Sequence, residues 1–98
     1  MEITTHAQLQ DSILEACAFY GFHVHHCAMN RSRAGFPDLV IIGRRGVLWR
    51  ELKVPPDTVT SEQRLLGYKL LANDQDWKIW TPAELASEEI IRELEMIR

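Results

Sequence analysis

Two apolar runs separated by a short connection constrain this chain more than any other feature. Residues 38–43 and 47–54 are rich in Val, Ile, Leu and Trp, and residues 43–46 between them read GRRG. Such runs around a short Gly-containing connection predict a β-hairpin. If the two glycines are the outer residues of the turn, the pairing register follows, and Asp38 stands directly opposite Glu51.

The remaining segments complete the predicted order α-β-β-β-α-β-α. A helix is expected at residues 4–20, a strand at 22–28, a loop at 29–37, the hairpin, a break at Pro55-Pro56, a helix at 60–72, a strand at 77–81, and helical structure from Pro82 onward with Ser87 capping residues 88–98. Hairpins beside helices predict an α/β domain with a mixed sheet, also describable as α+β. With 98 residues, we expect a single domain spanning the chain.

Two short patterns predict how the helices begin and end. Thr5 with Gln8, and Thr60 with Gln63, have the spacing of capping boxes. Gly21 stands where a C-terminal cap is expected. A stripe of apolar residues at helical spacing should turn the first helix inward. These residues are Leu9, Ile13, Cys17 and Tyr20.

The second run of the hairpin carries the chemistry. Side chains two residues apart on a strand project from the same face, so Glu51 lies beside Lys53. Asp38, its cross-strand neighbour, faces the same side with Cβ atoms about 5 Å apart. Two carboxylates so close are destabilising without a cation between them, and Mg²⁺ is commonly held by one or two carboxylates. The alternative is a solvated Glu-Lys ion pair and an ordinary Pro-Asp turn.

Charge is distributed unevenly along the chain. The net charge is −3, yet residues 20–56 contain six basic residues and only two acidic ones, Asp38 and Glu51. A basic region of this kind is typical of a nucleic-acid interface. Candidate phosphate contacts are Arg31, Ser32 and Arg33 in the loop and Arg44 and Arg45 in the turn. A scatter of solvated arginines is the alternative.

Three motifs together resemble those of the virus-type replication-repair nuclease (VRR-NUC) family of PD-(D/E)xK nucleases. They are Gly35-Phe36-Pro37-Asp38-Leu39, Trp49-Arg50-Glu51-Leu52-Lys53 and Thr60-Ser61-Glu62-Gln63. The resemblance implies a restriction-endonuclease-like core and hydrolysis of DNA phosphodiesters with Mg²⁺ or Mn²⁺. It implies Asp38, Glu51 and the Leu52 carbonyl as metal ligands, Lys53 as the residue that handles the attacking water, and Gln63 as a residue that positions Lys53 or the DNA backbone.

For two of these positions, Gln63 and the first-helix position of the metal site, the sequence also allows a purely structural role. Gln63 lies on the inward stripe of its helix, but it is also the third residue of a capping box. In the first helix, where the family commonly has a glutamate that completes the metal site, this sequence has His6. Histidine accepts Mn²⁺ better than Mg²⁺, or it could contact a phosphate. A buried or capping histidine is the alternative.

Small members of the family resemble Holliday-junction resolvases, so the resemblance implies a homodimer acting on four-way junctions or other branched DNA. A non-catalytic DNA-binding or assembly module, and a nicking nuclease without junction preference, are the alternatives. We expect no membrane span, a cytoplasmic location, a phage or prophage origin, and two reduced cysteines, Cys17 and Cys27. Strand alternation separates His23 and His25 from His26, so these histidines are expected at the surface or facing DNA, and not at a metal.

Overall fold

The computed structural model describes residues 2–26 and 34–98. Its elements follow one another as expected, except that the last helical segment is divided in two. They are α1 (His6–Tyr20), β1 (His23–His26), β2 (Leu39–Ile42), β3 (Val47–Leu52), α2 (Ser61–Ala72), β4 (Asp76–Trp80), α3 (Pro82–Ala86) and α4 (Glu89–Met96). The fold class predicted from the sequence is therefore confirmed.

The helix ends follow the local sequence. Thr5 and Thr60 cap α1 and α2 through complete capping boxes with Gln8 and Gln63. Gly21 ends α1 in the left-handed conformation, with φ 75°, which glycine adopts without steric cost. These termini are formed by residues within a few positions of one another, which is why the sequence predicts them.

The C-terminal segment differs in detail from the expectation. Glu88, with φ 66°, separates α3 from α4, so the last helix begins one residue later than predicted. Ser87 ends α3, and its hydroxyl oxygen accepts a long hydrogen bond from the Glu89 N–H (3.4 Å). Ser87 therefore serves both helix ends, in place of the simple cap that was expected.

The four strands form one sheet in the order β1-β2-β3-β4. The pairs β1·β2 and β2·β3 are antiparallel, whereas β4 runs parallel to β3. Leu39 pairs with Arg50 and Ile42 with Val47, which is the register that the sequence predicts for the hairpin. The connection through α2 brings β4 beside β3 in the parallel orientation.

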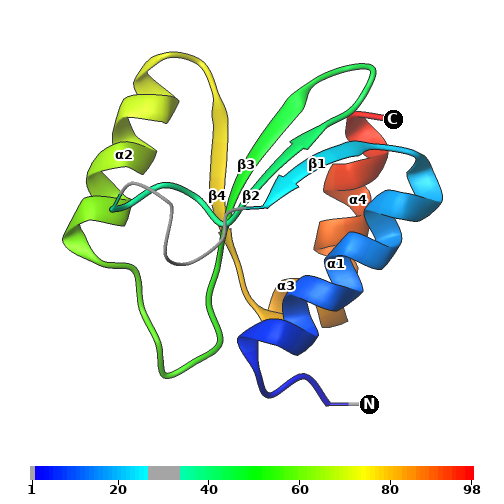
Figure 1. The fold of residues 1–98 in the computed structure, drawn as a ribbon, viewed down its shortest axis with the longest axis horizontal. Helices are drawn as coiled ribbons and strands as arrows, with labels where there is room; N and C mark the ends of the chain where they lie inside the picture. Colours follow the sequence, from blue (N-terminus) through cyan, green and yellow to red (C-terminus); the bar gives the residue numbers. More distant parts are fainter. Residues whose placement is uncertain (1, 27–33) are drawn as a thin grey trace.

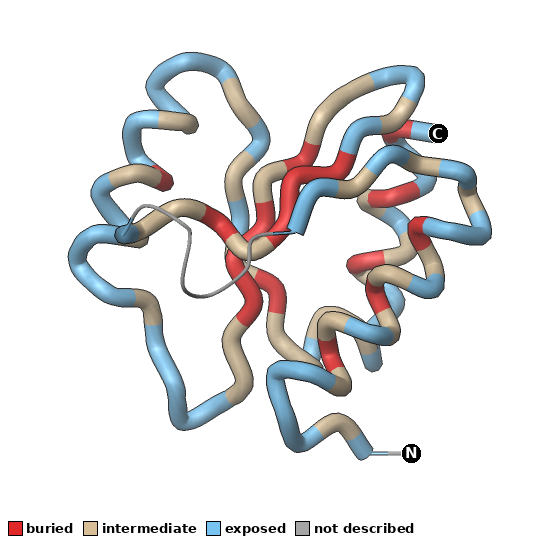
Figure 2. Tube along the Cα trace, in the orientation of Figure 1, coloured by how far each residue is buried: buried red, intermediate tan, exposed pale blue. Residues whose placement is uncertain are grey.

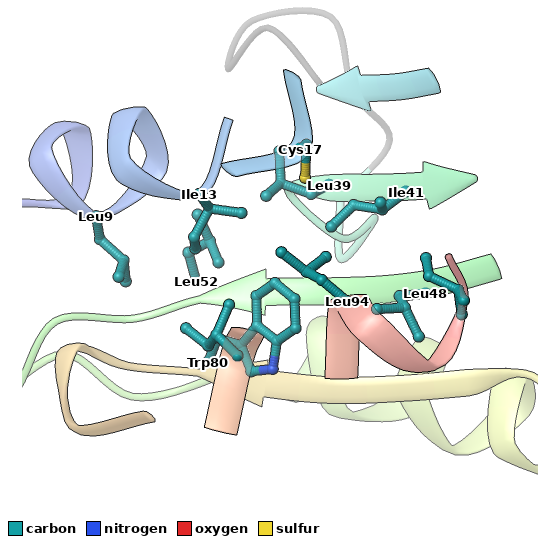
Figure 3. Close-up of a cluster of buried hydrophobic side chains, with 11 residues drawn as sticks. Leu9, Ile13, Cys17, Leu39, Ile41, Leu48, Leu52, Trp80 and Leu94 are labelled. Carbon is teal, nitrogen blue, oxygen red and sulfur yellow. The ribbon is translucent and has the colours of Figure 1, made fainter. Parts of the chain in front are cut away.

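Helices cover the two faces of the sheet unequally. In Figure 1, α1, α3 and α4 lie on one side of the strands and α2 lies on the other. The buried residues follow the central strands and the inner sides of α1 and α4 (Figure 2). Figure 3 shows this core, in which Cys17 and Ile13 of α1 lie close to Leu39 of β2 and Leu9 lies farther toward the start of α1.

Cys17 is buried as predicted, and burial raises the pKa of its thiol to about 11. Cys27 lies outside the described residues. Within the part of the chain that the structure describes, no helix has the length and apolar character needed to cross a bilayer.

Candidate functional site

Asp38 and Glu51 meet at the end of the hairpin away from its turn. The register of β2 and β3, continued by one pair beyond Leu39 and Arg50, places them directly opposite one another. The Gly43 N–H donates to the Gly46 carbonyl (2.9 Å). By alternation Asp38 and Glu51 form a non-hydrogen-bonded pair, the type that brings opposing side chains closer. The convergence predicted from the sequence is therefore present.

Glu51 is a buried carboxyl group. Only 1% of the residue is exposed, and its Oε2 has no hydrogen-bond partner. Burial, the hydrogen bond with Asp38 and the negative charge of Asp38 raise the pKa of Glu51 to about 9, against a smaller opposing effect of the Lys53 charge. Without a cation, Glu51 is therefore protonated at neutral pH and donates a hydrogen bond to Asp38.

Asp38 is the ionised member of the pair. Burial acts to raise its pKa, but hydrogen bonds from Glu51, the Leu52 N–H and His6 outweigh that effect and hold the pKa below its usual range. The Leu52 N–H donates to Asp38 Oδ2 (2.8 Å), and His6 Nε2 lies 3.3 Å from the same oxygen. The first helix thus contributes His6 to the site, as the sequence suggested.

The Leu52 carbonyl also faces this group. In an extended strand the N–H and C=O of one residue point to the same edge, and the Leu52 N–H points to Asp38. The pairing ends at Leu39 and Arg50; continued by two pairs it would set Pro37 opposite Leu52, and proline has no N–H to donate. The carbonyl therefore lacks the ladder donor that any other residue would supply, which leaves its oxygen free to accept another partner.

Lys53 continues β3 beside this group. Its N–H donates to the Trp80 carbonyl (3.0 Å), so the backbone keeps its pairing with β4, and strand alternation places the side chain on the Glu51 face. Its charge lowers the Glu51 pKa. Among the described residues, Lys53 makes no ion pair within 4.0 Å, so the ammonium group is not already committed to a partner.

Gln63 adopts the capping role that the sequence left open. Its Oε1 accepts a hydrogen bond from the Thr60 N–H (2.8 Å). Within residues 2–26 and 34–98, its side chain has no hydrogen bond to Lys53 or to either carboxylate. Its backbone nevertheless borders the site loop: Gly35, with φ +87°, packs so tightly on Glu62 and Gln63 that a Cβ would lie 2.5 Å from the Glu62 carbonyl oxygen. A direct role for Gln63 remains a prediction.

Arg50 does not belong to the basic surface region that the sequence predicts. Although Arg50 was counted in the basic region, none of its side chain is exposed, and it pairs with Glu93 (2.7 Å) and Asp76 (3.0 Å). It alternates with Leu48 and Leu52 on the core face, where its guanidinium also lies 4.8 Å from the centre of the Trp80 ring. Arg50 is thus a core cation. The sequence pattern that could have indicated this is its two-residue spacing from Leu48 and Leu52, which places all three on the same face of β3.

The predicted phosphate contacts are separated from the carboxylates. Arg44 and Arg45 are exposed in the turn, beyond Gly43, which is itself roughly 16 Å from Asp38 at about 3.3 Å per residue. Arg31, Ser32 and Arg33 lie outside the described residues. The structure therefore groups Asp38, Glu51, the Leu52 carbonyl, Lys53 and His6, and leaves Arg44 and Arg45 at a distance.

The donor set fits a hard divalent cation, although it is not a preformed cluster. Among residues 2–26 and 34–98, three or more His, Cys, Asp or Glu side chains do not come together as a metal site. The paired carboxyl groups, the unpartnered Glu51 Oε2 and the Leu52 carbonyl are nevertheless the oxygen donors that Mg²⁺ and Mn²⁺ accept, with water completing the shell.

Comparison with solved structures reveals the same fold elsewhere. A chain described as "VRR_NUC domain" superimposes with a TM-score of 0.71 at 17% identity, covering 98% of this chain and 100% of the other. A "VRR_NUC domain protein" gives a TM-score of 0.63 at 18% identity, covering 82% and 79%. No family model and no curated protein matches the sequence. The chain therefore has the fold of VRR_NUC domains over nearly its whole length.

Proposed function

We propose that this chain is a VRR-NUC nuclease that hydrolyses DNA phosphodiesters with Mg²⁺ or Mn²⁺. One observation carries the proposal: half-buried Asp38 converges with fully buried Glu51, whose Oε2 has no partner, beside an uncommitted lysine. Burying two acids at one point is costly unless a cation replaces their shared proton. The VRR_NUC fold of the chain supports the same conclusion.

The position of each residue assigns it a different role in the proposed reaction. Asp38, Glu51 and the Leu52 carbonyl would hold the ion, with His6 as a further candidate ligand from α1. A bound divalent ion would supply positive charge to the scissile phosphate and lower the pKa of a water molecule. Lys53, on the Glu51 face, would orient the attacking water and balance charge that develops on the phosphate.

The substrate and assembly are finer parts of the proposal. We assign branched DNA, with the four-way junction as the reference substrate, and a homodimer in which each subunit cuts one strand. The exposed face of α2 supports self-association, because Leu65, Tyr68 and Leu71 are each about half exposed at spacings of three residues. Light scattering of the purified protein would test the dimer, and Leu65→Glu should then yield monomers.

Cleavage assays test the activity. Labelled junctions, flaps and linear duplex would be incubated with Mg²⁺ or Mn²⁺ and with wild type, Asp38→Asn, Lys53→Ala or Glu15→Gln, the last an exposed position on α1. We expect cleavage by wild type and Glu15→Gln, with a loss of at least about 100-fold in the two site variants. Equal rates for all four proteins would contradict the proposal, and equal cleavage of every substrate would point to a general nicking nuclease.

A non-catalytic DNA-binding module is the second candidate. The argument in its favour is that burial and the neighbouring Asp38 raise the pKa of Glu51 to about 9, so the two carboxyl groups can share a proton without a cation. Calorimetric titration separates the two, because a nuclease of this type must bind Mn²⁺ and lose that binding in Asp38→Asn. Salt-sensitive DNA binding without any Mn²⁺ binding would favour the module.

A further inference from the structure

A hollow at the turn end of the hairpin combines aromatic and basic side chains. It has a volume of about 400 Å³, and its lining includes Tyr20, Phe22, His23, Ile42, Arg44 and Arg98. No Asp or Glu lines it, although the whole chain has a net charge of −3. The lining is therefore basic and aromatic in an acidic protein, with Glu95 beside it as the partner of Tyr20 and Arg98.

The aromatic wall is built where α1 ends. Tyr20 and Phe22 stack with ring centres 5.2 Å apart. Phe19, which is 84% exposed, packs edge-to-face with Tyr20, and their ring centres are 5.4 Å apart. Gly21 reverses the chain between them. A large aromatic side chain left in water beside two stacked rings offers a surface for another planar group.

The cations stand at the rim of this wall. The Arg98 guanidinium lies 5.7 Å from the centre of the Tyr20 ring and pairs with Glu95 (3.1 Å). Arg44 is exposed in the turn, and the described part of the chain gives its side chain no hydrogen bond or ion pair. Arg44 is thus the cation most available to an anionic ligand.

The hollow and the carboxylates lie at opposite ends of the hairpin, and the hollow is lined both by Tyr20 and Arg98, from the α1 and α4 side of the sheet, and by Ile42 of β2. Ile42 is four residues from Asp38 on β2, so strand alternation places both on one face, and His23 pairs with Ile42. Along β2, Ile42 and Asp38 are separated by roughly 13 Å, at about 3.3 Å per residue. His23 lines the hollow, His25 lies between it and the carboxylates on β1, and Glu51 is the only acidic residue in β1, β2 and β3.

We propose that this hollow binds an unpaired DNA strand that extends beyond the cleavage site, with one base against the aromatic wall and a phosphate at Arg44 and Arg98. The inference rests on the proposed nuclease function, which it refines by assigning selectivity for branched substrates to a single-stranded segment. Base stacking on aromatic rings together with arginine contacts to phosphate is how sequence-tolerant single-strand sites are made. A paired base cannot reach the wall without leaving its stack.

Fluorescence anisotropy in chelator would test this without any dependence on cleavage. The probe is a labelled single-stranded oligothymidylate, with a duplex of equal length for comparison. Arg44→Ala should weaken single-strand binding by about fivefold or more and reduce the salt slope by about one. Arg92→Ala, at an exposed position of α4 that does not line the hollow, should bind as wild type.

Two tyrosine variants separate the ring from its hydroxyl, which donates to Glu95 (3.1 Å). Tyr20→Leu should weaken single-strand binding about fivefold or more, whereas Tyr20→Phe should retain it. Arg44→Ala binding as tightly as Arg92→Ala, or an equal loss for duplex and single strand, would overturn the proposal. Loss of binding in Arg44→Ala when wild type shows no cleavage with Mn²⁺ would instead support the strand site and reject the nuclease.

Discussion

Replacing Glu51 by glutamine should make the metal-free protein more stable at alkaline pH. Glutamine has nearly the same shape, stays neutral and can still donate a hydrogen bond to Asp38. The wild-type carboxyl has a pKa raised from 4.5 to about 9 by burial and by Asp38. The folded state therefore favours the protonated form, which the unfolded chain loses at a much lower pH.

The direction of the pH effect follows from that difference. The stabilisation is fully present below the unfolded pKa and is lost as pH rises toward the folded pKa. At about 1.4 kcal/mol per pH unit, wild type should lose about 3 kcal/mol from this group between about pH 6 and about pH 8. Glu51→Gln lacks this loss, so its advantage over wild type should grow by that amount.

Urea unfolding followed by tryptophan fluorescence in chelator would measure the effect. Taking the difference between variant and wild type at each pH cancels the other titrating groups. Glu15→Gln, at an exposed position on α1, is the matched control and should parallel wild type. If the free energies of unfolding of Glu51→Gln and wild type also run parallel between pH 6 and pH 8, the shared-proton description of this pair is wrong.

Three further predictions concern the same region. Because Glu51 must lose its proton to bind an ion, calorimetry should show Mn²⁺ affinity rising about tenfold per pH unit toward pH 9; a pH-independent affinity would exclude Glu51 as a ligand. Gly35→Ala should cost about 2 kcal/mol or more in urea unfolding and weaken Mn²⁺ binding, whereas Gly21→Ala, with nothing within 4 Å of its Cβ, should cost only about 1 kcal/mol. Arg50→Ala should cost about 3 kcal/mol or more because it leaves Glu93 without its shortest ion pair; a loss below 1 kcal/mol would show that the pair is dispensable.

The local features of this protein were readable from its sequence. The capping boxes at Thr5 and Thr60, the end of α1 at Gly21 and the register of the hairpin all depend on residues close in the chain. The convergence of Asp38 and Glu51 belongs to this class, because a short turn and a two-residue side-chain period determine which residues of a hairpin face one another.

What only the tertiary structure decided depends on contacts between distant segments. Arg50 looks like a surface cation until Glu93, 43 residues away, is brought against it. The contact between His6 and Asp38 exists because α1 packs across the start of β2. The high pKa of Glu51 and the aromatic hollow beside Arg44 likewise arise from burial and from the meeting of α1, the turn and the C-terminal residue. Periodicity determines the face on which a side chain lies, but burial and charge pairing depend on which other segments cover that face.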